Sequence, residues 1–157
     1  MPELPEVETV INGMRPVITG QTVGQVILNR EGLRVPFPAN MDGRLSGSSV
    51  VKCHRRAKYI LADFDNGQTM IMHLGMSGRV LLTKPHDNYE LQKHDHMEII
   101  FKNGVRLVYN DARRFGMVYL CDTDKTSEHK SLAKLGPEPL DPPLSGDALL
   151  QKLSGKK

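Results

Sequence analysis

The sequence predicts a mainly β fold of the α+β kind: a two-layer antiparallel β-sandwich of about eight strands with an N-terminal helix packed against it. Short apolar segments recur at roughly even spacing from residue 22 onward, as expected for a sandwich or barrel. Two Asn-Gly pairs, at 66–67 and 103–104, are strong hairpin signals between such segments. Before residue 20 the apolar residues recur instead at helical spacing, which predicts the helix.

The N-terminal helix is expected to begin at Pro5, because proline suits the first helical position, where no backbone N–H is needed. Glu6 and Glu8 then fall in the first turn, where the helix dipole favours negative charge. Gly13 and then Pro16 are expected to end or kink the helix. Packing on a core would hold the N-terminus in a fixed place. The expected apolar face consists of Leu4, Val7, Val10, Ile11 and Met14.

Strand predictions follow from the alternation of apolar and polar residues and from the turn residues that bound them. Residues 31–48 are rich in Pro, Gly and Asn and are expected to form a long loop. The polar segments 84–93 and 122–131 are predicted to be loops as well. The expected strands are 22–29, 50–56, 59–64, 69–74, 79–83, 95–101, 105–109 and 117–121.

A domain boundary is expected near residue 135. Residues 1–135 are predicted to form the β-sandwich domain, and 136–157 a proline-rich linker followed by the start of a helical segment. Ser145 or Asp147 could cap this short helix, which would end near Leu153. A chain of 157 residues suits one domain with such an extension.

Composition excludes several classes of protein. With 39% hydrophobic and 25% charged residues the chain is typical of globular proteins, and its net charge of +3 is compatible with a nucleic-acid partner. The two cysteines, Cys53 and Cys121, form no Cys-x-x-Cys pair, which rules out a cysteine zinc site within this chain. No apolar run approaches the ~18 residues of a membrane span and no signal peptide is present, so we expect a cytoplasmic protein without a membrane partner.

Pro2 is the first candidate functional residue. If the initiator Met1 is removed, which a small second residue favours, the chain begins with a secondary amine that can attack an electrophilic carbon and form a Schiff base. An α-amino group titrates near ~8, against ~10.4 for lysine, so more of it is neutral at neutral pH. Glu3 stands beside Pro2 and could move protons. The alternative is a frayed, inert terminus.

A basic cluster follows in the segment 52–58. On a strand, its alternate residues Lys52, His54, Arg56 and Lys58 would share one face. Such a row of cationic or near-cationic groups needs anions, which the phosphate backbone of a nucleic acid supplies. The alternative is a solvated basic face without a ligand.

Two loops carry side chains suited to insertion between bases. Arg113 and Phe115 lie in a hairpin-like loop between strands, where an arginine can read a base edge and a phenylalanine can wedge a base step. Met76 lies in a glycine-flanked loop, where a flexible apolar side chain can act in the same way. The alternatives are an ordinary turn with one core phenylalanine, and a core methionine.

Histidines raise a different possibility. His94 and His96 would point to the same face of a strand, and together with His73 they could ligate a metal ion and form a metalloenzyme site. The spacing is a weak signal, and the alternative is histidines that contact phosphate or backbone. No metal is assigned to the chain.

Taken together and in order, the motifs resemble those of the formamidopyrimidine-DNA glycosylase (Fpg or MutM) family, and the resemblance covers residues 1 to about 140. The endonuclease VIII group shares the Pro-Glu start but usually lacks the Leu-Pro-Glu-Val continuation and the Leu-Gly-Met-Ser-Gly loop, so the resemblance favours the branch that acts on oxidised purines. The motifs are PELPEVET at 2–9, RRAKY at 55–59, HLGMSG at 73–78, KHDH at 93–96, DARRFG at 111–116 and LGPEPL at 135–140.

The resemblance implies a monomeric DNA-repair enzyme, a bifunctional DNA glycosylase/AP lyase that excises 8-oxoguanine and formamidopyrimidines from double-stranded damaged DNA. The amine of Pro2 would form the Schiff base, Glu3 would protonate the opening sugar, and Lys58 would assist strand cleavage by β-elimination and bind phosphate. The implied DNA-binding residues are His73, His94, Arg113 and Lys156, and the implied base-stack wedge consists of Met76, Arg113 and Phe115.

The chain also departs from the family. Family members continue with a helix–two-turn–helix unit and a cysteine zinc finger, neither of which lies in this sequence, so no cofactor is expected. Ala112 stands where a proline is common. The alternative to an active enzyme is an inactive truncated domain that binds DNA weakly and without specificity.

Overall fold

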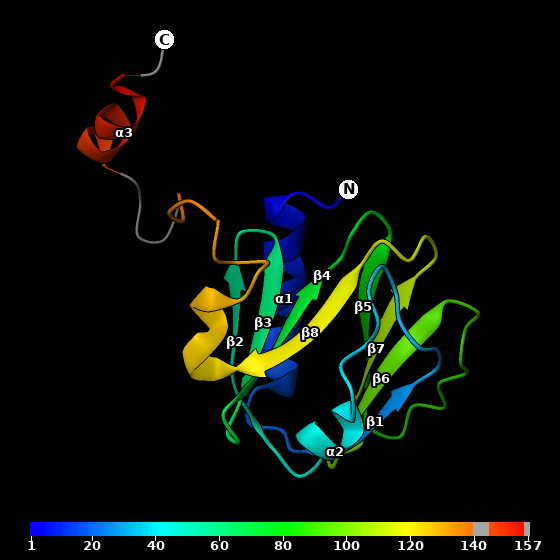
Figure 1. Cartoon of the computed structure of the whole chain (residues 1–157). Coiled ribbons are helices and arrows are strands. Elements are labelled where there is room, and N and C mark those ends of the chain that lie inside the picture. Colours follow the sequence, from blue (N-terminus) through cyan, green and yellow to red (C-terminus); the bar gives the residue numbers. More distant parts are fainter. Residues whose placement is uncertain (140–144, 156–157) are drawn as a thin grey trace.

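The computed structural model describes residues 1–139 and 145–155 and contains two four-stranded sheets that pack face to face (Figure 1). The strand order is β1-β6-β7-β5 in one sheet and β2-β3-β4-β8 in the other, and all neighbouring strands are antiparallel. This confirms the predicted sandwich. The strands are β1 (Val23–Leu28), β2 (Val50–Arg56), β3 (Tyr59–Phe64), β4 (Gln68–His73), β5 (Gly78–Thr83), β6 (Asp95–Phe101), β7 (Arg106–Asp111) and β8 (Met117–Asp122).

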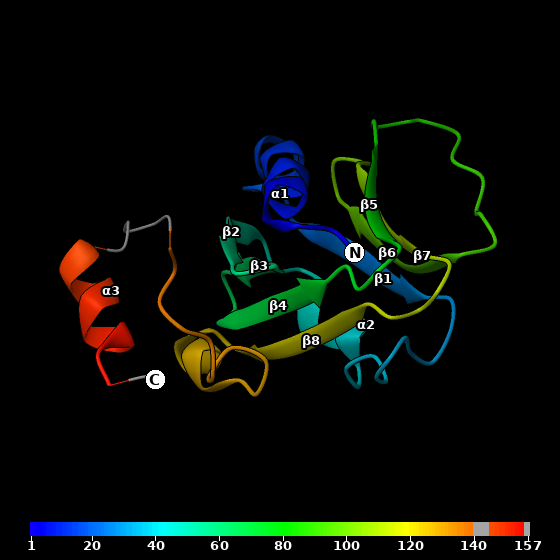
Figure 2. The same ribbon diagram turned by 90° about the horizontal axis from the view of Figure 1, so that it is seen from above.

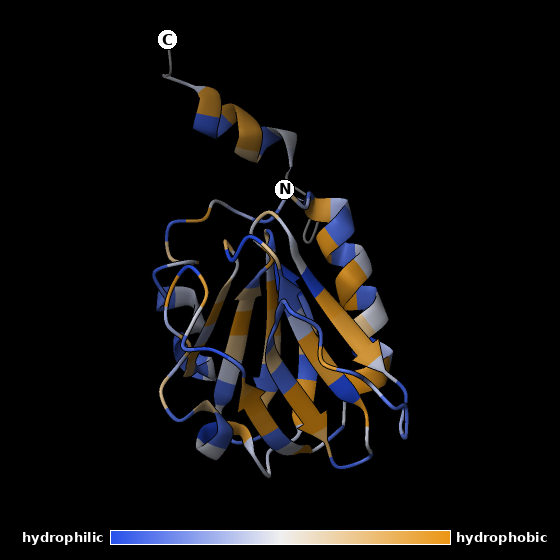
Figure 3. Ribbon diagram, turned by 90° about the vertical axis from the view of Figure 1, so that its right-hand side faces the viewer, coloured by the Kyte–Doolittle hydropathy of each residue, from blue (hydrophilic) through white to orange (hydrophobic). Residues whose placement is uncertain are grey.

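The helix α1 (Leu4–Ile18) packs against β2 and β3, with apolar residues toward the strands (Figure 3). Its buried residues are spaced three or four apart, which gives one apolar face. The expected end near Gly13 or Pro16 was wrong, because the helix continues two residues beyond Pro16. Ile18 is 1% exposed, and its burial offsets the backbone hydrogen bond that Pro16 cannot donate.

Three further helices are short. The helix α2 (Met41–Leu45) and the 3₁₀ helix η1 (Thr123–Glu128) lie in segments that were predicted to be loops. The helix α3 (Gly146–Leu153) is capped by Ser145, whose Oγ accepts a hydrogen bond from the N–H of Ala148, 3.2 Å away. In the described part of the chain, none of the helices has the length and apolar character needed to cross a membrane.

The main core fills the space between the two sheets and extends under α1. A smaller apolar cluster covers the outer face of β3 and β4, where Leu61 and Ile71 pack with Leu132 from the segment after η1. Strands β3 and β4 are therefore buried on both faces. This second cluster holds the chain that leads to Gly136 against the sandwich.

The strand register brings turns of both sheets to one end of the molecule, which is at the top in Figure 1 and is called the upper end below. The connections 74–77 and 112–116 both cross between the sheets here. The turn 57–58 and the N-terminus of α1 lie at the same end (Figure 2). The residue pairs that mark this end are Tyr59–His73, His73–Met117 and Gly78–Asp111.

Candidate active site and nucleic-acid interface

The N-terminal residues are held beside Lys58. The N–H of Glu3 donates to Oε2 of Glu6 across 2.5 Å, which ties the residue before α1 to its first turn. Nζ of Lys58 lies 2.9 Å from Oε2 of Glu3. Through this hydrogen bond and its positive charge, Lys58 lowers the pKa of the Glu3 carboxyl. The structure therefore brings Glu3 and Lys58 together, next to a half-buried Pro2.

The turn that carries Lys58 is strained and fixed on both sides. Ala57 has φ +50°, in the left-handed region that residues other than glycine seldom adopt. Its N–H donates to Oε2 of Glu138 at 3.0 Å, and its carbonyl accepts from Nη1 of Arg55 at 3.0 Å. Arg55 in turn lies 2.7 Å from both Glu138 and Glu8. Residue 138, from the predicted linker, therefore orients a turn of the candidate site.

The basic row expected on one strand face is largely neutralised within the protein. Strand β2 ends at Arg56, so Lys58 belongs to the turn and not to the strand. Three of the four side chains in this row are paired with carboxylates of the protein. The fourth, Lys52, has no carboxylate oxygen within 4.0 Å in the described ranges. The pairs are Lys58 with Glu3, Arg56 with Glu138 and His54 with Asp63, at 2.9, 3.1 and 3.0 Å.

His73 is placed to donate a hydrogen bond while uncharged. Its burial lowers the pKa of the imidazole, and the charges of Lys58 and Arg34 lower it further. Nδ1 accepts a hydrogen bond from the N–H of Gly75 at 3.0 Å, so the proton of the neutral ring resides on Nε2. A neutral N–H donor at this position suits a phosphate oxygen.

His94 and His96 do not form a metal site with His73. The rings of His94 and His96 lie near each other, with centroids 6.3 Å apart. His96 is buried, however, and its Nε2 bonds to the carbonyl of Asp111 at 2.8 Å. Across residues 1–139 and 145–155, no group of three or more His, Cys, Asp or Glu side chains is arranged to hold a metal ion. The geometry thus favours the reading of His96 as a backbone contact.

The three predicted wedge residues lie on the two loops that cross the upper end. Met76 and Phe115 are exposed by 43% and 42%, so both side chains are accessible from solvent. The guanidinium of Arg113 lies over the Phe115 ring, 4.9 Å from its centroid. Neither apolar residue belongs to the core, so the alternative of core side chains was wrong.

Asp111 joins these two loops. Apart from its place in the Asp-Ala-Arg-Arg-Phe-Gly motif, nothing in the sequence marks it as a site residue. Its buried carboxylate accepts hydrogen bonds from Oγ of Ser77 at 2.6 Å and from the N–H of Gly116 at 2.8 Å. Ser77 then accepts from the N–H of Arg113 at 2.9 Å. The bases of both loops are thereby held together by one carboxylate.

Glycine is required where the loops touch. At Gly75, with φ +60°, a Cβ atom would lie 2.4 Å from the carbonyl carbon of Phe115. At Gly116 a Cβ atom would lie 1.8 Å from Oη of Tyr109, which donates to the carbonyl of His73 at 2.8 Å. Gly75 is therefore required by close packing against backbone, and Gly116 mainly by the hydroxyl of Tyr109.

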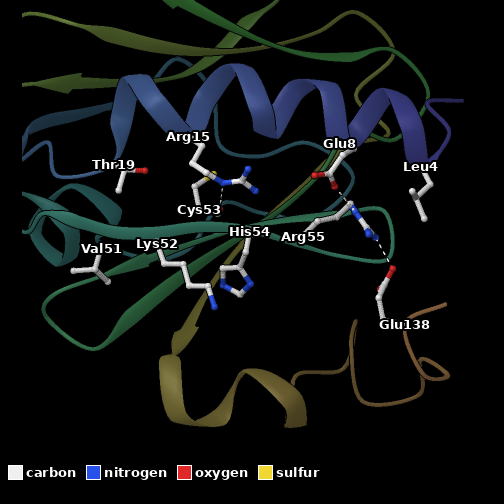
Figure 4. A pocket seen from close by; sticks show the side chains of 10 residues that line it. All are labelled: Leu4, Glu8, Arg15, Thr19, Val51, Lys52, Cys53, His54, Arg55 and Glu138. Carbon is white, nitrogen blue, oxygen red and sulfur yellow. Dashed lines mark hydrogen bonds and ion pairs between the residues drawn. The ribbon is translucent and has the colours of Figure 1, made fainter. Parts of the chain in front are cut away.

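One hollow of the described surface adjoins the turn that carries Lys58, because Arg55 and Glu138 are among its lining residues. It is a groove of about 680 Å³ between α1 and β2, and Figure 4 shows Arg15 reaching across it to the carbonyl of Cys53. Burial raises the pKa of the Cys53 thiol to about 11, so this cysteine is an inert core residue. The remaining predicted site residue, Lys156, lies outside the described residues.

Comparison with solved structures shows which known proteins share this fold. The chain superposes on Lactococcus lactis formamidopyrimidine-DNA glycosylase, bound non-covalently to DNA with an AP site, with a TM-score of 0.84 and 29% identity over 97% of this chain and 57% of that one. The same score and identity hold for the wild-type L. lactis enzyme in complex with DNA that contains N7-benzyl-Fapy-dG. The fold is therefore the one that this DNA glycosylase adopts over the matched 57% of its chain.

Sequence comparison identifies the family to which the chain belongs. The N-terminal domain model of formamidopyrimidine-DNA glycosylase matches residues 1–118. The formamidopyrimidine-DNA glycosylases of Dinoroseobacter shibae and Ruegeria sp. (strain TM1040) are 48% and 45% identical over 99% and 100% of this chain. The chain belongs to the formamidopyrimidine-DNA glycosylase family. It spans 57% and 58% of the length of these two relatives.

Proposed function

We propose that this chain is the catalytic N-terminal part of a DNA-repair enzyme, a bifunctional DNA glycosylase/AP lyase that removes oxidised purines from double-stranded DNA. The observation that carries the proposal is the placement of Pro2, Glu3 and Lys58 at the upper end, beside His73 and the two loops with exposed wedge residues. Family membership supports the same chemistry.

The first step needs a neutral amine, and Glu3 can provide it. Once Met1 has been removed, the Pro2 nitrogen is a secondary ammonium at neutral pH. Glu3, which Lys58 keeps as a carboxylate, accepts its proton. The freed electron pair attacks C1′ of the damaged nucleotide, the bond from C1′ to the base breaks, and the base leaves with the bonding electrons. The departing base anion takes up the second proton of the Pro2 nitrogen, which gives the nitrogen a lone pair again.

The proton on Glu3 then opens the sugar. Protonated Glu3 donates it to the ring oxygen O4′ as the C1′–O4′ bond breaks, and the nitrogen lone pair forms the iminium. Glu3 thus returns to the carboxylate form, and its role as an acid agrees with its low pKa, because the proton comes from Pro2 rather than from solvent. The iminium acidifies the proton on C2′, whose removal expels the 3′ phosphate by β-elimination.

The surrounding residues would deliver the nucleotide. A base within a duplex must leave the stack before its C1′ can be attacked, at a cost of a few kcal/mol. Insertion of Met76, Arg113 and Phe115 into the gap would offset part of this cost. Lys58 and the Nε2–H of His73 would bind phosphate on the strand that carries the lesion.

Borohydride trapping tests the proposal. Chain from which Met1 is absent by mass spectrometry is incubated with duplex DNA that contains 8-oxoguanine or an abasic site, and the reduced adduct is mapped by peptide. We expect a sugar remnant on the N-terminal peptide, both in the wild-type protein and in Lys58→Ala. Salt-dependent binding without any adduct would instead favour a domain that only binds DNA.

A further inference from the structure

A second group of arginines gathers beside the wedge loops, in a hollow of about 530 Å³ formed by residues 30–36 and Arg114. Arg30, Arg34 and Arg114 all line this hollow, and all three are exposed. Arg34 is also one of the two cations whose charge lowers the pKa of His73, whereas Arg30 and Arg114 have no part in the site described above. Three guanidinium groups around one depression repel one another unless an anion lies between them.

The segment that carries two of these arginines is rigid. The N–H of Phe37 donates a hydrogen bond to the carbonyl of Glu31 at 3.0 Å, which closes residues 31–37 into a loop. Within this loop, Gly32 forms a β-bridge with Pro36. A Cβ atom at Gly32 would lie 2.6 Å from Cα of Pro36, so only glycine permits this tight turn. The arginines are therefore presented by a fixed scaffold.

The turn is also joined to the wedge loop. The N–H of Arg34 donates to the carbonyl of Gly116 at 3.3 Å. Arg114, at the tip of that loop, has φ +60°. Backbone strain of this kind costs about 1–3 kcal/mol and occurs most often at active sites and ligand-binding segments.

The charges in this hollow have no internal partner. In residues 1–139 and 145–155, none of the three arginines has a carboxylate oxygen within 4.0 Å, although Glu31 lines the same hollow. Arg55, by contrast, lies 2.7 Å from two carboxylates. The protein thus neutralises its cations around Lys58 and leaves those around Arg34 available to an external anion.

We propose that Arg30, Arg34 and Arg114 form a binding site for backbone phosphate of duplex DNA, separate from the phosphate contacts of Lys58 and His73. The inference rests on the proposed function, because the hollow adjoins the loops that would enter the base stack. Guanidinium groups bind phosphate oxygens bidentately, and such contacts are independent of base sequence. The site would hold the DNA while the wedge residues insert.

Equilibrium binding at several salt concentrations tests this site. The ligand is a fluorescent duplex with a tetrahydrofuran abasic analogue, and the same duplex without it is measured in parallel. For Arg34→Gln/Arg114→Gln we expect the slope of log K against log salt to fall by about 1 to 2, since each lost phosphate contact removes about 0.9. The loss should be equal on both duplexes.

Two matched variants make the result decisive. Lys102→Gln removes one positive charge from the β6–β7 turn at the far end of the sheet and should leave the slope unchanged. Arg114→Gly should reduce the slope while the protein becomes as stable or more stable, because glycine relieves the strain.

The outcomes separate the two proposals. A slope in Arg34→Gln/Arg114→Gln equal to that of Lys102→Gln overturns the phosphate site, even if the wild-type chain forms the borohydride adduct. A reduced slope without any adduct supports the site and overturns the proposed chemistry. Absence of duplex binding by the wild-type chain at low salt overturns both.

Discussion

The pKa of the Glu3 carboxyl depends mainly on one neighbour. Its carboxylate is exposed, so burial has little effect on it, and the contact with Lys58 is the main cause of its lowered pKa. A nearby cation favours the charged form, and the proton-transfer scheme above depends on that form.

The replacement Lys58→Met keeps the length of the side chain and removes its charge. We expect the pKa of the Glu3 carboxyl to rise toward its ordinary value of 4.5, which ¹³C NMR titration of the side-chain carboxyl measures directly. In Lys52→Met, which removes a cation that does not contact Glu3, the titration should match the wild type. An unchanged midpoint in Lys58→Met would show that the 2.9 Å contact is not formed in solution.

Gly116 has no room for a methyl group. In Gly116→Ala the new Cβ would meet Oη of Tyr109 at 1.8 Å, and we expect a loss of about 1–3 kcal/mol in the free energy of unfolding by urea. Removal of the hydroxyl in Tyr109→Phe should make the same substitution less costly, so that the double variant is more stable than the two single effects predict. If the effects of the two single substitutions on stability simply add, the contact between the new Cβ and Oη of Tyr109 is contradicted.

At the scale of elements, α1 connects the core to the candidate site. Gly13 lies in the middle of this helix, with nothing within 4 Å of an added Cβ atom. We therefore expect Gly13→Ala to stabilise the protein by about 0.5–1 kcal/mol, measured by thermal or urea unfolding. A lower stability would mean that the helix ends near Gly13, as the sequence alone suggested.

The loops 74–77 and 112–116 act as one element because Asp111 holds both. Asp111→Ala leaves the N–H of Gly116 without its acceptor, and we expect a loss of about 2–3 kcal/mol in stability. Amide hydrogen exchange should accelerate in both loops and not in the β2–β3 turn. Ser77→Ala, which removes only one of the two donors, serves as the milder control. Faster exchange in one loop alone would argue against a shared tie.

At the scale of the whole molecule, Glu138 links the segment after the sandwich to β2. Burial alone would raise the pKa of its carboxyl, but the hydrogen bond from Ala57 and the charges of Arg55 and Arg56 outweigh burial and lower it. A group with a lowered pKa in the folded state stabilises the protein above its ordinary pKa of 4.5, and this contribution is lost as the pH falls through the folded value.

Glu138→Gln should therefore destabilise the protein by about 2–4 kcal/mol at neutral pH, because it leaves the buried Arg55 with one carboxylate fewer. The difference from the wild type should shrink below about pH 4.5. Urea unfolding at several pH values measures it, and Glu128→Gln, at an exposed residue of η1, provides the control. A difference that is constant with pH would contradict the ionic role of Glu138.

The fold was predictable because its strands are short, recur at roughly even spacing and are separated by turn residues, among them two Asn-Gly pairs. The helix α2 was not, since five residues cannot show a helical period, and it begins at Asn40 in a left-handed conformation. The extension of α1 past Pro16 depends on the burial of Ile18, a tertiary effect. Such tertiary contacts leave no signal in the local pattern of apolar and polar residues.

The residues of the candidate site that lie in short sequence motifs were predictable. The contacts that hold them, made by residues distant in sequence, were not. Pro2, Glu3, Lys58 and the wedge residues stand in short motifs. The carboxylates that neutralise the basic row are distant in sequence, and Glu138 bonds to a turn 81 residues earlier. Local sequence patterns carry no information on contacts between residues so far apart, so they did not predict that carboxylates of the protein would pair with the basic row.

The hydrogen bond between Ala57 and Glu138 affects where force on the chain acts on the domain. The same segment also accepts a hydrogen bond from Arg56 at the carbonyl of Gly136, so the chain leaves the sandwich attached to β2 and to the turn that follows it. Force applied to the chain after Pro139 would therefore act first on the end of β2 and on the turn that carries Lys58.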